Sequence, residues 1–517
     1  MVKSSKAELI KNLSRKMARI INSILTNTLR RCWNFQSDKP AFNCRFSFFD
    51  DIIFLVEVKY MLLPAFIDSH LHMLGIGYYQ EIIDLKSTKS INEIIELVKD
   101  KDLSFLVARG FNQANLKEKR MPVKQDLQEI DKPLILFRIC GHVAVVNQKM
   151  LDLMKIDEST PQIEGGSFDY NTGIFTEKAL GLVYDKIPEP TKEDLKRYLI
   201  NANKILISNG ITKVASDDFS SFNVPYKLVI EAINEVDEMG LLDVEITEQI
   251  NLPIDKLQDF ISKGYANKRF NNFKMGPLKI LADGSLGGKT AALFEDYSDD
   301  FGNKGILTFT DQELYDLVSL ANKNGMDSVI HAIGDRTVDQ VIKTFKRVQE
   351  ENPRKSQGNA IIHAQLATKK QIAEMKENNI GAIVQPIFIN SDIKIVDERI
   401  GIRKYDSYLF KTMFNTINTG FSTDSPVENV NPFENIYIAI SRKSIDFPEY
   451  EIFLKEEAFS VEDAIKAYTD ENIRFVYDES HDDYIEINQD IYQIPVEEIK
   501  DIKVIKVLKK GKIIYEI

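Results

Sequence analysis

The sequence predicts a (β/α)₈ barrel of the TIM type, with an inserted α/β subdomain and a small β-sandwich built from the two chain ends. The first observation behind this prediction is the alternation, after residue 60, of short apolar runs with helix-like stretches, which is typical of parallel βα repeats. The second is that four of the six histidines lie at or just after the ends of such runs. All strands of such a barrel end at one mouth, which holds the active site. The order of strands and the placement of histidines therefore predict the same architecture.

Eight apolar runs supply the expected barrel strands. The first covers residues 62–68 and ends at the histidine pair of the motif PAFIDSHLH, and the other seven follow from Gly210 onward. They are ITKVASDD, LLDVEIT, PLKILADG, MDSVIHAIG, NAIIHAQ, IGAIVQP and TGFSTDS. Between them, residues 311–324, 337–351 and 369–378 carry amphipathic patterns long enough for helices. This succession is the one expected for eight strand–helix units.

Other segments lie outside the repeat. Residues from about 75 to 190 carry their own apolar runs and are too long for one loop, which predicts an inserted subdomain that ends before an N-capping Thr191. Residues 50–61 and 474–517 contain alternating apolar and polar positions, which predicts a β-sandwich flanking a barrel domain of residues 62–473.

Residues 1–49 form an atypical basic N-terminal segment. Within the first 31 residues, eight basic side chains face only Glu8, and apolar residues recur mostly every three or four positions, as in a helix. Three interpretations stay open: a solvated or docking basic helix, a segment like a transit peptide, and an upstream start that does not belong to the fold. Residues 31–47 are expected to be irregular.

Composition limits the classes of partner. The net charge of −12 argues against nucleic acid, and no apolar run approaches the roughly 18 residues that a membrane span needs. The three cysteines share no metal-type spacing, so a reduced, cytoplasmic setting is expected. A homo-oligomer stays open.

Five residues form the candidate metal site: His70, His72, His331, His363 and Asp424. The first two lie two positions apart at a strand end, so their side chains project the same way and can hold one ion. A barrel would bring the other three to the same mouth. Imidazole and carboxylate ligands suit zinc, with Mn²⁺, Fe²⁺ or Co²⁺ as alternatives, and we expect one or two ions per chain. A bound ion would supply hydroxide at neutral pH, with Asp424 acting first as general base and then as general acid.

The motifs PAFIDSHLH, ADGSLGGKTA, HAIGD, IIHAQ and STDSPVE, in this order, resemble the metal-dependent amidohydrolase superfamily. The branch they resemble most is amidohydrolase family 3, which includes proteins like N-substituted formamide deformylase. The resemblance implies that His70 and His72 hold the more buried metal and His331 and His363 the other. It also implies that Lys279, carboxylated on its amine, bridges the two metals, because an ammonium has no acceptor and cannot ligate a metal. The resemblance further implies that His142, which follows a glycine as in family members, contacts the substrate.

The resulting hypothesis is a hydrolase that cleaves a non-peptide C–N bond of a small amide-type substrate. A lactonase, phosphotriesterase or deaminase-type hydrolase on the same site, and a catalytically silent relative, are the alternatives. Three further expectations concern polar residues outside the ligand set. Asp217 or Asp218 would orient a ligand histidine, Gln385 faces the mouth, and His481 is solvent-exposed.

Overall fold

The computed structural model describes residues 43–49, 52–101, 103–138, 142–163, 165–356 and 358–517. Its centre is an eight-stranded sheet whose seven pairings are all parallel, in the order β16-β15-β14-β13-β12-β11-β10-β3. The strands are β3 (Phe66–Leu71), β10 (Ile211–Ser216), β11 (Glu245–Ile250), β12 (Phe273–Leu281), β13 (Ser328–Ala332), β14 (Ala360–His363), β15 (Gly381–Val384) and β16 (Thr419–Phe421). All eight predicted barrel strands are therefore confirmed.

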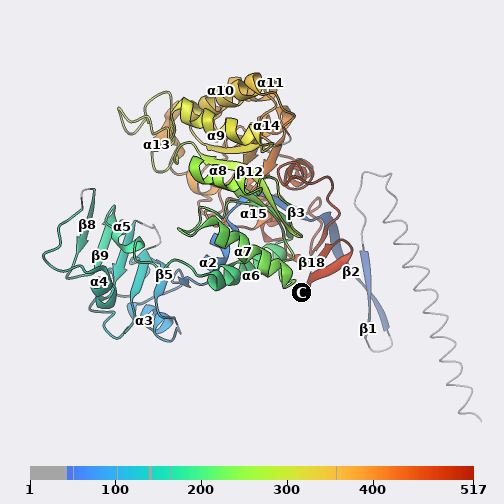
Figure 1. Ribbon diagram of the computed structural model, residues 1–517. Helices are drawn as coiled ribbons and strands as arrows, with labels where there is room; N and C mark the ends of the chain where they lie inside the picture. Colours follow the sequence, from blue (N-terminus) through green and yellow to red (C-terminus); the bar gives the residue numbers. More distant parts are fainter. Residues whose placement is uncertain (1–42, 50–51, 102, 139–141, 164, 357) are drawn as a thin grey trace, which may run out of the picture.

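Helices cover the outside of this sheet (Figure 1). In chain order they are α6 (Lys192–Ser208), α7 (Tyr226–Glu238), α8 (Ile254–Ser262), α9 (Asp311–Lys323), α10 (Asp335–Glu351), α11 (Lys369–Glu377), α14 (Phe410–Thr416), α15 (Pro432–Ser441) and α16 (Val461–Tyr468), with the short α12 (Phe388–Asp392), α13 (Val396–Ile400) and 3₁₀ turns η1 (Gly401–Asp406), η2 (Lys455–Glu457) and η3 (Asp470–Asn472) between them. The predicted cap of α6 is confirmed, because Thr191 and Asp194 form a reciprocal capping box there. One continuous apolar core joins the barrel strands to these helices.

The first strand meets the eighth through side chains as well as backbone. The Ser69 hydroxyl donates to the carbonyl of Phe421 at 3.0 Å, and the amide of Asp424 donates to the carbonyl of His70 at 2.9 Å. Below them the fully buried Asn472 donates from Nδ2 to the carbonyls of Ile67 and Phe421, at 2.5 and 2.7 Å. These bonds close the seam of the barrel.

The inserted segment forms its own six-stranded mixed sheet beside the barrel (Figure 1). The sheet order is β4-β5-β6-β7-β9-β8, from strands β4 (Ile83–Asp84), β5 (Leu106–Phe111), β6 (Leu134–Arg138), β7 (Val143–Val146), β8 (Gly166–Asp169) and β9 (Ile174–Glu177). It is preceded by α2 (Met73–Tyr79) and accompanied by α3 (Ile91–Lys99), α4 (Gln148–Met154) and α5 (Leu180–Tyr184). Two apolar clusters separate from the barrel core lie within this segment.

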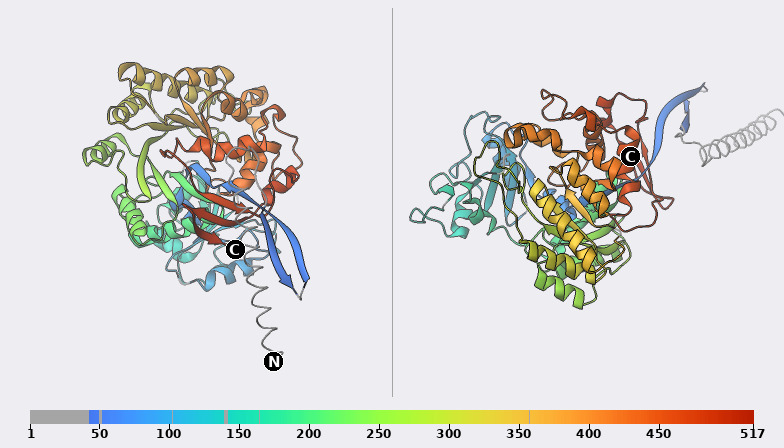
Figure 2. Two further views of the ribbon diagram at one scale, coloured as in Figure 1. Left: turned by 90° about the vertical axis from the view of Figure 1, so that its right-hand side faces the viewer. Right: turned by 90° about the horizontal axis from the view of Figure 1, so that it is seen from above.

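Both ends of the chain meet in a five-stranded antiparallel sheet, where blue and red strands run side by side in Figure 2. Its order is β1-β2-β17-β18-β19, from β1 (Asn43–Phe49), β2 (Ile52–Pro64), β17 (Tyr484–Ile487), β18 (Val504–Lys509) and β19 (Lys512–Glu516), with η4 (Val496–Asp501) before β18. The expected β-structure built jointly from the two chain ends is confirmed, and in the described residues it is a single five-stranded sheet.

Two boundaries differ from the sequence prediction. Residues 62–64 do not start the first barrel strand, because they pair with β17 as the end of β2, and β3 begins only at Phe66. Part of the stretch expected to be irregular is a strand, since residues 43–49 pair with β2. The predicted basic helix of residues 1–31 lies outside the described residues. No helix in the described ranges combines the length and the apolarity needed to cross a membrane.

We expect Asn472→Ala to weaken the seam of the barrel. The substitution leaves the carbonyls of Ile67 and Phe421 without this donor in a buried place, which lowers the free energy of unfolding by about 2–4 kcal/mol. Chemical denaturation followed by fluorescence measures the change. Asn324→Ala at the exposed end of α9 is the matched control and changes stability by less than about 0.5 kcal/mol. Equal stability of the two variants would contradict the role given to Asn472.

Candidate metal centre

Three of the predicted ligands converge at the carboxyl ends of the first and eighth strands. Ligand atoms of His70, His72 and Asp424 all lie within 4.8 Å of one another. Nε2 of each histidine lies 3.2 Å from Oδ1 of Asp424. His70 is in β3 and His72 just follows it, whereas Asp424 follows β16, so the closed seam brings them together.

Lys279 reaches the same point from the middle of the barrel wall. It lies in β12, is 3% exposed, and its Nζ is 3.1 Å from Nε2 of His70. Burial lowers the pKa of its amine, against the opposing charges of Asp217 and Asp424. Lys279 thus lies directly beside His70, and its role as a bridging ligand stays a prediction.

The second pair of histidines lies next to this cluster. The ring centroids of His331 and His363 are 4.5 Å apart, and those of His363 and His70 are 6.0 Å apart. Nε2 of His331 donates to the carbonyl of Gly284 at 3.1 Å and lies 3.2 Å from Oδ1 of Asp283. This contact leaves Nδ1 of His331 as the nitrogen with a free lone pair.

Two glutamines orient the most buried imidazoles. Nδ1 of His70 donates to Oε1 of Gln249, and Nδ1 of His363 donates to Oε1 of Gln385, both at 2.7 Å. The glutamine amides are held in turn, because Nε2 of Gln249 donates to the carbonyl of Ser69 and Nε2 of Gln385 to the hydroxyl of Ser422. A proton fixed on Nδ1 leaves the Nε2 lone pair free for a metal ion.

His72 is oriented by backbone. Its Nδ1 donates to the carbonyl of Asp217 at 2.8 Å, while the carboxylate of Asp217 accepts from Ser220 and Asn251. Asp217 thus orients a histidine as predicted, but through its carbonyl. Asp218 is not involved, since its carboxylate accepts from Ser216 and from the amide of Leu74.

Burial and mutual charge set the protonation of the cluster. Burial, helped by the charge of Lys279, lowers the pKa of His70 to about 4, and burial also holds the pKa of His363 well below its usual range. Burial alone would raise the pKa of Asp424, but the adjacent imidazoles of His70 and His72 keep it well below its usual range. Burial likewise acts to lower the pKa of His72, yet the hydrogen bond and charge of Asp424 raise it to about 9. The neutral imidazoles of His70 and His363 beside a carboxylate anion are donors that fit a divalent ion, and His72 joins them when it gives up its proton.

Backbone strain coincides with the site. Of the 14 non-glycine residues with positive φ in the described part of the chain, three lie at the site: His363, Ala364 and Asp424, with φ of 74°, 48° and 56°. Such conformations cost of the order of 1–3 kcal/mol each and persist only where the surroundings enforce them. The bonds that fix Asp424 and His363 therefore also hold them in strained positions that aim their side chains.

Several contributing residues were missed by the sequence analysis. Gln249 and Glu248 are both fully buried in β11, and a polar pair at the end of a predicted barrel strand was the available signal. Asp283, in the motif ADGS, accepts from the amides of Ile333 and Gly334 and from the Thr337 hydroxyl, which fixes the segment after His331. Burial raises the pKa of Glu428 to about 7, and its carboxyl accepts from Ser391.

Two other histidines lie outside the cluster. His142 directly precedes β7 of the inserted sheet and is largely exposed. Its Nδ1 lies 3.3 Å from the carboxylate of Glu177. In the described part of the chain it contacts none of the candidate ligands, so its substrate role stays a prediction. The expectation that His481 is solvent-exposed is wrong, because the residue is half-buried and its Nε2 donates to the carbonyl of Ala65 at 2.5 Å.

Comparison with known proteins agrees with this geometry. Residues 60–515 match the model of the amidohydrolase family. The chain is 28% identical to YtcJ of Bacillus subtilis (strain 168) over 482 residues, covering 88% of this chain and 89% of that protein. It is 19% identical over 443 residues to N-substituted formamide deformylase of Arthrobacter pascens, covering 79% and 78%.

Among solved structures, an uncharacterized metal-dependent hydrolase from Pyrococcus horikoshii OT3 superimposes with a TM-score of 0.71 at 29% identity. The match covers 84% of this chain and 87% of that one. The expected family resemblance is thereby confirmed.

We expect the two glutamines to control metal affinity. Gln249→Leu or Gln385→Leu removes the acceptor that fixes the imidazole tautomer, so each weakens divalent-metal binding about 10- to 100-fold. Competition with a chromophoric chelator measures the affinity. Gln312→Leu, on the exposed face of α9, is the control and leaves the affinity unchanged. Unaltered affinity in both barrel variants, with circular dichroism like that of the parent, would rule out this positioning role.

Proposed function

The chain belongs to the amidohydrolase family, and from that premise we propose that it is a metal-dependent hydrolase that cleaves an amide-type C–N bond of a small molecule. The observation that carries the proposal is the convergence of His70, His72 and Asp424 within 4.8 Å, with Lys279 beside them. Asp424 offers a carboxylate oxygen, and His70 and His72 offer imidazole nitrogens. Such a mixed set of ligand atoms at one point suits a divalent ion.

We propose that His70, His72 and Asp424 hold a first ion, and that His331 and His363 hold a second, with Lys279 between them. When bound, such ions activate a water molecule for attack and polarise the scissile carbonyl. Zinc is the ion that we expect.

Asp424 supplies the proton transfers in this proposal. Its carboxylate is anionic at neutral pH because His70 and His72 keep its pKa well below the usual range. It can therefore accept a proton from the attacking water as the C–O bond forms. Asp424 then gives this proton to the nitrogen of the leaving amine as the C–N bond breaks, so that the amine leaves in its neutral form.

Lys279 needs a covalent change to take part. Its buried amine has a lowered pKa, which increases the fraction of the neutral form. A neutral amine adds to carbon dioxide and loses one proton to give a carbamate anion, which offers two oxygens as ligands. The modification replaces a cation beside His70 by an anion, and this change of sign is what a bridging ligand requires.

A substrate screen tests the function directly. The zinc-reconstituted protein should turn over at least one of a panel of N-formyl, N-acyl and cyclic amides, and the activity should disappear on chelation and return with zinc. Asp424→Asn should lower kcat about 10²- to 10⁴-fold because it removes the proton acceptor. Asp446→Asn, a carboxylate outside the cluster, is the control. Hydrolysis of lactones or phosphotriesters in place of amides would overturn the C–N assignment, and full activity of Asp424→Asn would overturn its role.

Carboxylation of Lys279 has its own measurement. Protein exchanged into ¹³C-bicarbonate should show one carbamate carbon resonance that is absent from Lys279→Gln. Lys213→Gln, which changes another buried lysine at 6% exposure, should keep the resonance. A spectrum without that resonance in zinc-loaded parent protein would refute the bridging role.

A further inference from the structure

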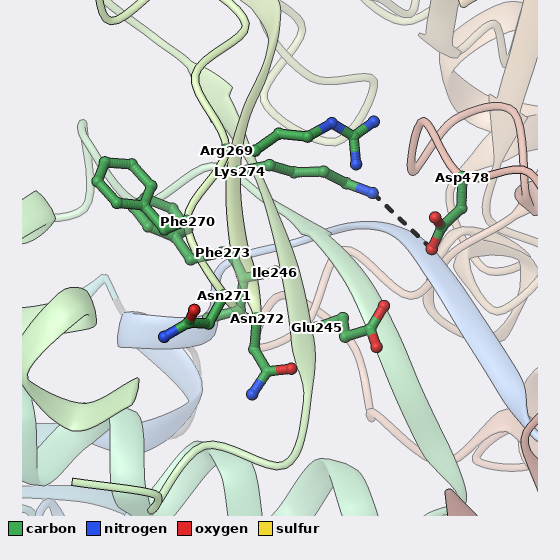
Figure 3. A pocket seen from close by; sticks show the side chains of 9 residues that line it. All are labelled: Glu245, Ile246, Arg269, Phe270, Asn271, Asn272, Phe273, Lys274 and Asp478. Atoms are coloured by element: carbon green, nitrogen blue, oxygen red, sulfur yellow. Dashed lines mark ion pairs between the residues drawn. The ribbon is translucent and has the colours of Figure 1, made fainter. Parts of the chain in front are cut away.

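The barrel end opposite the candidate metal centre holds a small polar cavity, of about 70 Å³ (Figure 3). Glu245 at the start of β11, Lys274 near the start of β12, Arg269 in the turn before it and Asp478 after the barrel line this cavity. Lys274 precedes Lys279 by five residues in the same strand, or about 16 Å at 3.3 Å per residue. The cavity is therefore distinct from the metal centre.

Lysines surround the first of its two carboxylates. Oε2 of Glu245 lies 3.1 Å from Nζ of Lys213, and Oε1 lies 2.8 Å from Nζ of Lys510 and 3.5 Å from Nζ of Lys509. Burial acts to raise the pKa of Glu245, but these three lysines together lower it to about 2. This carboxylate is fully compensated.

The second carboxylate, Asp478, pairs closely with Lys213 and lies 3.8 Å from Nζ of Lys274, which also donates to the carbonyl of Tyr477 at 3.2 Å. Arg269 donates to the carbonyl of Tyr477 at 2.9 Å and, within the described ranges, has no carboxylate partner. In Figure 3 the Lys274 and Arg269 side chains lie next to each other and extend toward Asp478. With Asp483, whose charge also acts on Lys509 and Lys510, the cluster gathers five cationic side chains around three carboxylates, an excess of two positive charges in a chain whose net charge is −12.

Three of these cationic side chains are poorly hydrated, whereas Arg269 and Lys510 are exposed. The side chains of Lys213, Lys274 and Lys509 are only 7%, 12% and 11% exposed. Burial lowers the pKa of Lys274 to about 8, and the like charges of Arg269 and Lys213 add to that effect against Asp478. Buried cations are stabilised by nearby negative charge, so an anion bound here would favour the charged form of Lys274.

We propose that the cavity binds a single phosphate-type oxyanion between Lys274 and Arg269. A planar guanidinium beside an ammonium matches the oxygens of such a group. The small volume admits one oxyanion group, either free inorganic phosphate or the phosphate end of a small metabolite. Arg269 and Lys274 would donate to the bound anion, whereas the carboxylate of Asp478 stays paired with Lys213.

Calorimetric titration of the full chain with inorganic phosphate tests the proposal. One saturable site per chain is expected, with binding weakened about tenfold or more by Arg269→Gln and by Lys274→Met. Lys274→Arg should retain binding, and Lys268→Gln, an exposed neighbour, should match the parent. Since Arg269 is exposed, its variant keeps the test valid if Lys274→Met does not fold. Absence of a saturable site, or equal binding by the parent and Arg269→Gln, would overturn the proposal.

Two further arms define the ligand. Chloride at the same ionic strength should not compete; full competition by chloride would show simple screening and overturn a specific site. Tighter binding of glycerol phosphate than of phosphate would identify a metabolite as the source, and the reverse would identify the free ion. With sulfate as probe, binding should weaken as pH rises through about 8, because Lys274 loses its proton there. Binding that does not change with pH would remove Lys274 from the site.

Discussion

Closure of the first strand on the eighth is the constraint on which the rest of the structure depends. The buried carboxylate of Asp68 accepts from the amide of His70 and from both the amide and the hydroxyl of Thr423, 355 positions away. His70 is one of these donors, and Asp424 directly follows the other, Thr423. The contact that closes the barrel therefore also sets the distance between the two candidate ligands. Burial raises the pKa of Asp68 to about 7, against the hydrogen bonds of Thr423. A buried carboxyl group needs hydrogen-bond donors, and closure of the barrel supplies those of Thr423.

The candidate centre draws its character from unequal protonation within a few ångströms. His70 and His363 are pushed toward neutrality by burial, whereas His72 is pulled toward the cation by Asp424. The negative charge of Asp424 is therefore the feature that attracts a cation, and the neutral imidazoles complete its surroundings. Gln249 and Gln385 provide neutral acceptors for this purpose. A carboxylate in their place would add a further buried negative charge and would raise the pKa of the imidazoles.

Much of this was readable from the sequence, because periodicity and capping act locally. The eight strands, the cap at Thr191 and the return of the chain end to a sheet were predicted from patterns within a few residues, and the histidines were predicted as ligands from their positions at strand ends. Partnerships across the barrel were not predictable in this way. The pairing of Gln249 with His70 joins residues 179 positions apart, and the burial of His481 results from contact with Ala65, 416 positions away. The boundary at Phe66 was missed for the same reason, since only the partner β17 decides that residues 61–64 belong to the other sheet.

The distance in sequence between β3 and β16 also has a consequence for folding during synthesis on the ribosome. At about 5–20 residues per second, some 350 residues take about 20 to 70 seconds to synthesise, and the edge of β3 has no partner from β16 during that time. Exposed strand edges invite pairing with other chains. The inserted segment is synthesised within this interval. Its own apolar clusters allow it to fold before β3 pairs with β16. Vectorial synthesis thus favours completion of the insertion first and of the metal-binding mouth last, when the segment around Asp424 leaves the exit tunnel.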